Sequence, residues 1–123
     1  MSDSRAGERR ELPRIGGRIM SADCPSRALM GHITSKWGVL ALVALSEGPR
    51  RWSELRHGIG GISEKMLAQT LRTLEGDGLV YRDSRPVVPP YVEYGLTDAG
   101  AEVTALLLPL LDWAENHAVG DGD

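Results

Sequence analysis

Residues 58–76 read GIGGISEKMLAQTLRTLEG, and they carry the strongest structural signal in the chain. The glycines at its start indicate a turn, because glycine adopts backbone conformations that other residues rarely reach. Ser63 then stands where a helix N-cap is expected, and Gly76 stands where the helix should end. Between these two, the apolar residues recur at helical spacing: Met66, Leu67, Leu71 and Leu74. The stretch therefore predicts a tight turn followed by an amphipathic helix over residues 63–76.

The other face of this helix carries hydrogen-bonding side chains. Glutamine can pair with adenine in bidentate fashion, and lysine or arginine can read guanine or neutralise a phosphate. The alternative is an ordinary solvated helix face, and Glu64 and Glu75 are expected as surface charges. The candidate contacts to duplex DNA on this face are Ser63, Lys65, Gln69, Arg72 and Thr73.

The segments on both sides of this stretch complete a recognisable order. The sequence predicts helices over 25–35 and 36–47, a short strand over 50–52, a brief helix over 53–57 capped by Ser53, strands over 79–84 and 91–96, and a last helix over 97–116 capped by Thr97. The predicted fold class is mainly α with a small β-hairpin wing, a winged helix-turn-helix. Such a fold lets one helix enter a major groove while the hairpin reaches the flanking backbone. Arginines beside the groove would clamp phosphates: Arg51 before the short helix, and Arg82 and Arg85 in the wing.

Length and composition allow one domain. The chain has 123 residues, of which 41% are hydrophobic and 25% charged, as in soluble globular proteins. We expect a flexible N-terminal tail over 1–20, the winged domain with its last helix over 21–117, and a disordered acidic tail over 118–123. The net charge is −3, yet every Lys and Arg precedes residue 97. One end of the molecule is thus suited to face DNA, although a solvated acidic helix explains the charge equally well.

The longest apolar run, residues 39–45, is far shorter than the ~20 residues of a membrane span. No apolar segment follows the charged N-terminus as it would in a secretory signal. The expected location is therefore the cytoplasm, without a membrane partner.

The last helix carries apolar residues on nearly all of its faces. One face of a small domain cannot cover that much apolar surface, so we expect a two-fold homodimer through this helix and the helix near the N-terminus. The alternative is a fully buried core helix. The expected interface residues are Leu106, Leu107, Leu110, Leu111 and Trp113.

The single cysteine, Cys24, precedes a helix start, where the helix dipole favours the thiolate. Asp23 opposes this effect, and a free cysteine is often only a small buried hydrophobe. Cys24 is therefore a candidate redox sensor with a structural alternative. The three histidines lack metal-ligand spacing, and no catalytic or cofactor motif is present, so no metal, cofactor or catalytic residue is expected.

The chain resembles the HxlR-type transcriptional regulators, relatives in shape of the MarR winged-helix proteins. The motifs that carry the resemblance are Cys24-Pro25, Lys36-Trp37, Gly48-Pro49, Ser53-Glu-Leu-Arg56, Gly61-Ile-Ser-Glu-Lys-Met-Leu67, Gly78-Leu-Val80, Val88-Pro-Pro90, Val92-Glu-Tyr94 and Leu96-Thr97. The resemblance implies a homodimer that recognises DNA through the helix at Ser63 and the wing from Arg82 to Tyr91, and it implies control of a neighbouring gene. Ser53 and Tyr91 are further candidate contacts to DNA. Tyr91 stands where the family often has a basic wing residue. Some members resemble thiol or aldehyde sensors that use the cysteine matching Cys24.

These features predict a sequence-specific transcription regulator that represses a neighbouring gene from a palindromic operator and responds to redox, electrophiles or a small-molecule effector. The alternative is a winged-helix module for protein or small-molecule binding without specific DNA binding. An enzyme would need Cys24 as nucleophile with a histidine base, and no enzymatic activity is expected.

Overall fold

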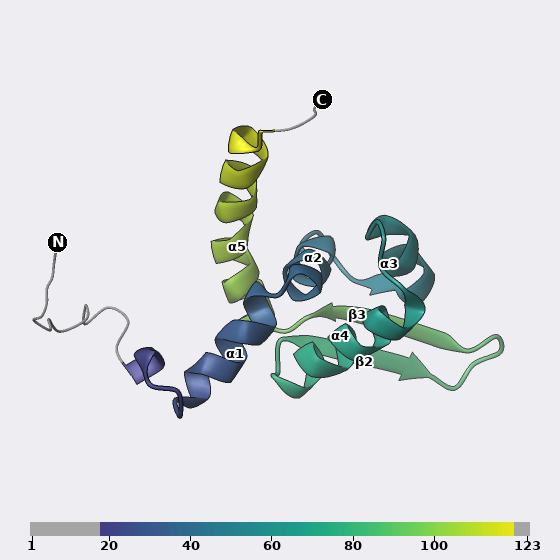
Figure 1. Cartoon of the computed structure of the whole chain (residues 1–123). Helices are drawn as coiled ribbons and strands as arrows, with labels where there is room; N and C mark the ends of the chain where they lie inside the picture. The colour runs from purple at the N-terminus through teal and green to yellow at the C-terminus, as the bar shows by residue number, and fades with distance from the viewer. Residues whose placement is uncertain (1–17, 120–123) are drawn as a thin grey trace, which may run out of the picture. The chain divides into compact units, whose positions relative to one another are not determined.

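The computed structural model describes residues 18–119. The chain divides between Gly31 and His32 into two units, and the second unit carries the sheet and every helix after α1. The elements are α1 (Pro25–Thr34), α2 (Lys36–Ala44), β1 (Arg50–Arg51), α3 (Trp52–Gly58), α4 (Glu64–Gly76), β2 (Val80–Arg85), β3 (Tyr91–Leu96) and α5 (Asp98–His117). Their order confirms the predicted winged helix-turn-helix (Figure 1).

Most of the two expected tails lies outside the described residues. Residues 18–20 form a short helical turn, and residues 118 and 119 have no regular secondary structure. The helix that follows the N-terminal segment, α1, starts at Pro25 as predicted, where a missing N–H costs nothing. It has no buried residue. In the described part of the chain, no helix has the length and apolar character needed to cross a bilayer.

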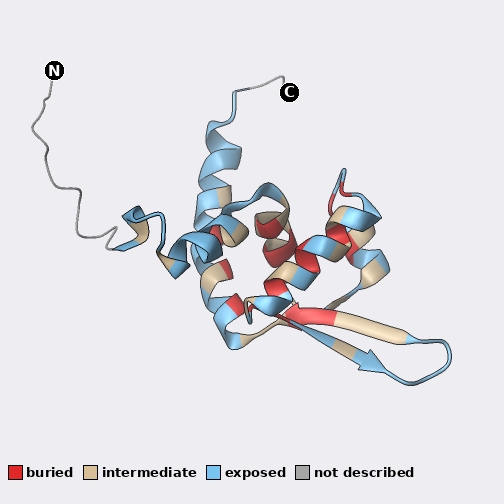
Figure 2. Ribbon diagram, turned by 60° about the horizontal axis from the view of Figure 1, so that its bottom comes forward, coloured by how far each residue is buried: buried red, intermediate tan, exposed pale blue. Residues whose placement is uncertain are grey.

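Helix α2 lies at the centre of the second unit. Its start is fixed by Ser35, whose Oγ accepts a hydrogen bond from the Gly38 N–H at 3.1 Å. Ala41 and Leu42 are completely buried, and α2 packs against α3, α4 and α5. Figure 2 shows the buried residues concentrated on α2 and on the inner side of α4. An evenly apolar helix needs such a position, because each of its sides must be covered.

Three antiparallel strands form a sheet in the order β1-β3-β2. Strands β2 and β3 pair from Val80↔Leu96 to Arg85↔Tyr91, and residues 86–90 join them as the tip of the wing. The two-residue strand β1 pairs with the other edge of β3, with Arg51 opposite Glu93. This pairing brings the start of α3 beside the middle of β3 (Figure 1).

The turn between α3 and α4 has the predicted chemistry. Gly61 has a φ of +83°, which side chains rarely allow, and the Ser63 Oγ accepts a hydrogen bond from the Met66 N–H at 3.0 Å. The expectation that Ser53 caps α3 is wrong. The N-cap is instead Arg51, two residues earlier, because Arg51 ends the β1 pairing and its N–H donates to the Glu54 carboxylate at 2.8 Å.

The sheet continues directly into α5 through Thr97. Its Oγ1 donates to the Gly78 carbonyl at 2.6 Å and accepts from the Gly100 N–H at 3.0 Å, which ties the helix start to the end of the α4–β2 connection. Gly100 lies so close to Leu79 that a Cβ on it would overlap the Leu79 carbonyl oxygen. The absence of a side chain at Gly100 is therefore what allows α5 to leave the sheet at this point.

The substitution Gly100→Ala should lower the free energy of unfolding by about 1–3 kcal/mol, because the clashing neighbour is backbone that has little freedom to move. Urea denaturation followed by circular dichroism measures the change. The matched control is Gly76→Ala at the end of α4, where a Cβ meets nothing within 4 Å. That variant should be as stable as the wild type or more stable by up to about 1 kcal/mol. Equal stability of the two variants would contradict the close contact.

Candidate DNA-binding surface

Helix α4 has one buried face and one exposed face. Leu67, Leu71 and Leu74 are almost fully buried in the core, and Thr70 lies with them at 8% exposure. Five side chains of this helix are predicted to point outward. Four of them are exposed, namely Ser63, Lys65, Gln69 and Arg72, and the fifth, Thr73, is half-buried. The polar face is therefore open to a partner and is not packed inside the subunit.

Lys65, Gln69 and Arg72 follow one another at spacings of four and three residues, which places them on one stripe of α4. None of the three side chains hydrogen-bonds or ion-pairs with another residue in the described part of the chain. Glu64 differs, because its carboxylate accepts from Arg56 at 3.2 Å. The stripe thus presents hydrogen-bond donors that have no partner in the described part of the chain, whereas Glu64 at the helix start is paired with Arg56.

Next to the tip of the wing, Tyr91 lies beside two arginines. The guanidinium carbons of Arg51 and Arg85 each lie 4.6 Å from the centre of its ring. The Tyr91 hydroxyl donates to Glu93 at 2.7 Å, and this hydrogen bond raises the pKa of the phenol. Arg85 also ion-pairs with Asp83 at 2.9 Å, which raises the pKa of its guanidinium. Tyr91, at a position where HxlR-type regulators often have a basic residue, therefore makes cation-π contacts with two arginines.

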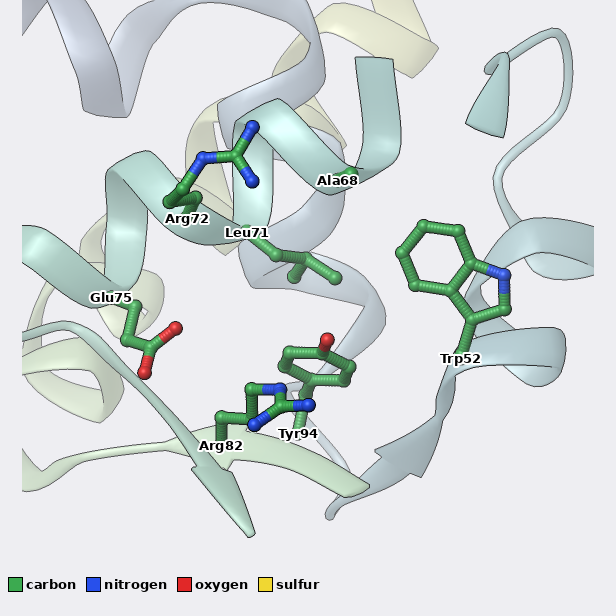
Figure 3. Close-up of a pocket in the computed structure, with 7 residues that line it drawn as sticks. All are labelled: Trp52, Ala68, Leu71, Arg72, Glu75, Arg82 and Tyr94. Atoms are coloured by element: carbon green, nitrogen blue, oxygen red, sulfur yellow. The ribbon is translucent and has the colours of Figure 1, made fainter. Parts of the chain in front are cut away.

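Between α4 and the sheet the surface is hollowed to a volume of about 300 Å³ (Figure 3). Its lining comes from four elements: Trp52 on α3; Ala68, Leu71, Arg72 and Glu75 on α4; Arg82 on β2; and Tyr94 on β3. Arg72 and Arg82, ten positions apart in sequence, both line this hollow. Sequence reasoning missed the hollow because its lining comes from four elements that meet only in the folded chain.

The remaining predicted contact, Ser53, is exposed in the first turn of α3. It lines a second, shallower hollow of about 260 Å³ together with Arg51, Trp52, Pro90 and Val92. The predicted residues thus fall into two neighbouring groups, one along α4 and one where α3 meets the wing.

One contact at the end of α4 had no sequence signal. The His32 Nδ1 lies 2.8 Å from the carboxylate of Asp77, the C-cap residue of α4. The two residues are 45 positions apart, and neither belongs to a motif. This pair ties the end of α1 to the end of α4.

The expected dimer residues separate into two sets. Leu106, Leu110 and Trp113 are exposed by 75, 57 and 59%. Leu107 is buried at 6% and Leu111 is half-buried against the same core, so Leu107 supports its own subunit and is not offered to a partner.

The candidate sensor, Cys24, is half-buried directly before α1. Hydrogen bonds from the Ser26 hydroxyl and then from the Ser26 backbone lower the pKa of its thiol. The pKa shift has the predicted direction, and its main cause is a local side chain. In the described residues, no cluster of histidine, cysteine or carboxylate side chains could hold a metal ion.

A free polar ridge on the second helix of a helix-turn-helix, beside a hairpin that carries arginines, defines a winged-helix DNA-binding protein. A family model described as HxlR-like helix-turn-helix matches residues 32–121. The chain belongs to this family of transcription regulators, as its sequence motifs predict.

Similar proteins carry consistent descriptions. The HTH-type transcriptional regulator YtfH of Escherichia coli K12 is 54% identical over 99 residues, which cover 80% of this chain and 79% of the relative. The structure of the transcriptional regulator ytfH from Salmonella typhimurium matches with a TM-score of 0.76 and 53% identity, over 80% of this chain and 88% of that one. The redox regulator HypR in its oxidised form matches with a TM-score of 0.72 and 33% identity, over 79% of this chain and all of that one.

Proposed function

We propose that this chain is a homodimeric repressor that binds a palindromic operator near a neighbouring gene, with residues 21–117 as the acting domain. The observation that carries the proposal is the stripe on α4, where Lys65, Gln69 and Arg72 are exposed and unengaged beside a wing that holds further arginines. A dimer places two such helices in successive major grooves, so its operator should have two symmetric half-sites about one helical turn apart.

Within each half-site, the contacts divide by chemistry. Gln69 and Arg72 face base edges, with Lys65 and Thr73 beside them and Ser63 at the helix start. The cations around Tyr91, with Arg82 and the Ser53 hydroxyl, contact phosphates on both sides of the groove. Bound at a promoter, such a dimer represses by occupying the DNA.

The substitution Arg72→Ala should weaken binding to the operator by about 1–3 kcal/mol, because it removes a contact to a base edge. Genome-wide footprinting identifies the operator, and fluorescence anisotropy measures the change in affinity. The charge-matched control is Lys36→Ala at the start of α2, which should keep wild-type affinity. Unchanged affinity in Arg72→Ala would contradict the assignment of α4 as the reading helix.

We place the dimer interface on the stripe formed by Leu106, Leu110 and Trp113, whose spacings of four and three align them on one side of α5. Exposed apolar side chains in a continuous line are typical of a covered interface. Helix α1 joins this interface, which is supported by its lack of any buried residue.

The substitution Leu110→Asp should convert the dimer to a monomer, because it places a charge in the apolar contact. Size-exclusion chromatography with light scattering measures the mass. Leu108→Asp is the control, since Leu108 is also exposed but lies about half a turn of the helix away. If both variants keep the wild-type mass, the interface lies elsewhere.

We assign the sensing role to Cys24. Its lowered pKa favours the thiolate, which is the reactive form. The chain has one cysteine, so oxidation by diamide joins the thiols of two chains, which together lose two protons and two electrons to the oxidant. A structural neighbour titled as a redox regulator supports this assignment.

Diamide should change the operator affinity of the wild type and leave that of Cys24→Ser unaltered. In Ser26→Ala the pKa of the thiol should rise, because the main hydrogen bond to the thiolate is lost, and alkylation by iodoacetamide should then need a higher pH. Anisotropy and the pH profile of alkylation measure the two effects. Equal affinities of reduced and oxidised wild type would remove Cys24 from the mechanism.

The hollow beside α4 favours a second candidate, a winged-helix module that binds a protein or small molecule without specific DNA binding. Binding that ignores DNA sequence and responds weakly to salt would support this alternative over the repressor. No enzymatic activity is part of either proposal.

A further inference from the structure

The face of the sheet that is turned away from α4 carries a row of charged residues. Arg51 on β1, Glu93 on β3 and Asp83 on β2 stand opposite one another in the register of the three strands. Residues directly opposite on neighbouring strands share a face of the sheet. Arg82 and Tyr94, which precede and follow the two acids along their strands, line the hollow beside α4. The charged row therefore lies on the other face, because successive side chains of a strand alternate.

Two carboxylates are neighbours in this row. Asp83 and Glu93 are directly opposite across β2 and β3, and like charges in such a pair destabilise a sheet unless other groups compensate them. The Asp83 carboxylate accepts from the Arg85 guanidinium at 2.9 and 3.3 Å. Glu93 accepts from the Tyr91 hydroxyl, and the guanidiniums of Arg51 and Arg85 both contact the ring of that tyrosine. We call these five residues the wing cluster.

The wing cluster has no net charge. Its two arginines are matched by its two carboxylates, and the hydrogen bond to Glu93 raises the pKa of the Tyr91 phenol, which keeps that group neutral. The stripe on α4 differs, because Lys65 and Arg72 have no acidic partner among residues 18–119. One half of the candidate DNA-binding surface is thus positive, and the other half is balanced.

The ion pair between Asp83 and Arg85 matters more for an approaching phosphate than for folding. The two side chains are 37 and 53% exposed, and ion pairs at exposed positions contribute little to stability. A phosphate that binds Arg85 has to share the guanidinium with the Asp83 carboxylate, and it is repelled by the charge of that carboxylate. The phosphate backbone carries no base sequence, so this cost is the same for every duplex.

We propose that Asp83 and Glu93 limit the sequence-independent affinity of this chain for DNA by neutralising the arginines of the wing. The inference rests on the proposed function, because it takes the wing as a contact to phosphates, and it names the residues that weaken this contact. A balanced wing adds little attraction to bulk DNA. The protein then leaves non-operator sites readily, and the base contacts of α4 decide where it remains bound.

The test removes each negative charge and keeps the hydrogen-bond acceptor. Asp83→Asn retains an oxygen for Arg85, and Glu93→Gln retains one for the Tyr91 hydroxyl. Each variant should bind a duplex of random sequence about three- to tenfold more tightly at low salt. The dependence of affinity on salt should become steeper by about one unit of slope, because one more cation is free to displace counterions from the DNA. Fluorescence anisotropy at several salt concentrations measures both effects.

The charge-matched control is Glu102→Gln, which neutralises an exposed acid on α5. It changes the net charge by the same amount but leaves the sheet untouched, so it should keep the wild-type affinity within about twofold. The operator should be bound more tightly by Asp83→Asn by the same factor as the random duplex, because a phosphate contact is indifferent to sequence. Thermal melting of each variant verifies that it folds.

The proposal is overturned if Asp83→Asn and Glu93→Gln both bind the random duplex as Glu102→Gln does. It is also overturned if they strengthen binding to the operator alone, since the two acids would then act on base recognition. A wild type without preference for any operator would contradict the proposed function, and the comparison on the random duplex would still decide the role of the two acids. If neither the wild type nor the variants bind any duplex at low salt, both proposals fail.

Discussion

The burial of the leucine face of α4 against α2 is the constraint on which the remaining structure depends. Leu67, Leu71 and Leu74 are 0, 2 and 1% exposed, and they meet the fully buried Ala41 and Leu42 in one core. A helix has one rotational setting in which these three residues face inward. That setting turns Lys65, Gln69 and Arg72 outward, so the packing of apolar side chains decides which polar side chains a partner meets. The contacts of α4 with α2 and β2 then set the distance between this ridge and the wing.

The positive and negative charges of the chain lie on different elements of the structure. A net charge of −3 disfavours DNA as a partner only when it is spread evenly. Here the basic residues of the second unit lie before α5, and α5 carries acidic residues but no lysine or arginine. The positive groups gather along α4 and the wing, where Tyr91 holds two guanidiniums within 4.6 Å of its ring. Local potential, which depends on such clusters, matters more for phosphate binding than the total charge.

Much of the fold follows from periodicity and capping, because these are local properties of the sequence. The turn at Gly61, the caps at Ser63 and Thr97, and the two strands of the wing each have a signal within a few residues. The sequence predictions are wrong where a residue's position depends on contacts with residues that are distant in sequence. The start of α3 depends on the pairing of β1 with β3, and the burial of Leu107 depends on which side of α5 meets α2. Likewise, a run of leucines predicts an apolar helix but cannot say which residues face the core.

The candidate site shows the same division. The polar stripe on α4 follows from helical spacing, whereas the hollow needs four elements that meet only in the folded chain. Alternation along β3 predicts that Tyr94 points inward, which is correct. That alternation cannot predict that Tyr94 also lines a hollow between α4 and the sheet.

The sensing role proposed for Cys24 requires that a change before α1 alters α4. Cys24 lies in the first unit, and α4 lies in the second. Coupling between two distinct sites is typically worth about 1–3 kcal/mol. Within the second unit, His32 at the end of α1 contacts Asp77, the C-cap residue of α4, at 2.8 Å. A displacement of α1 would act on α4 at this contact, because the leucine face of α4 is otherwise held in the core.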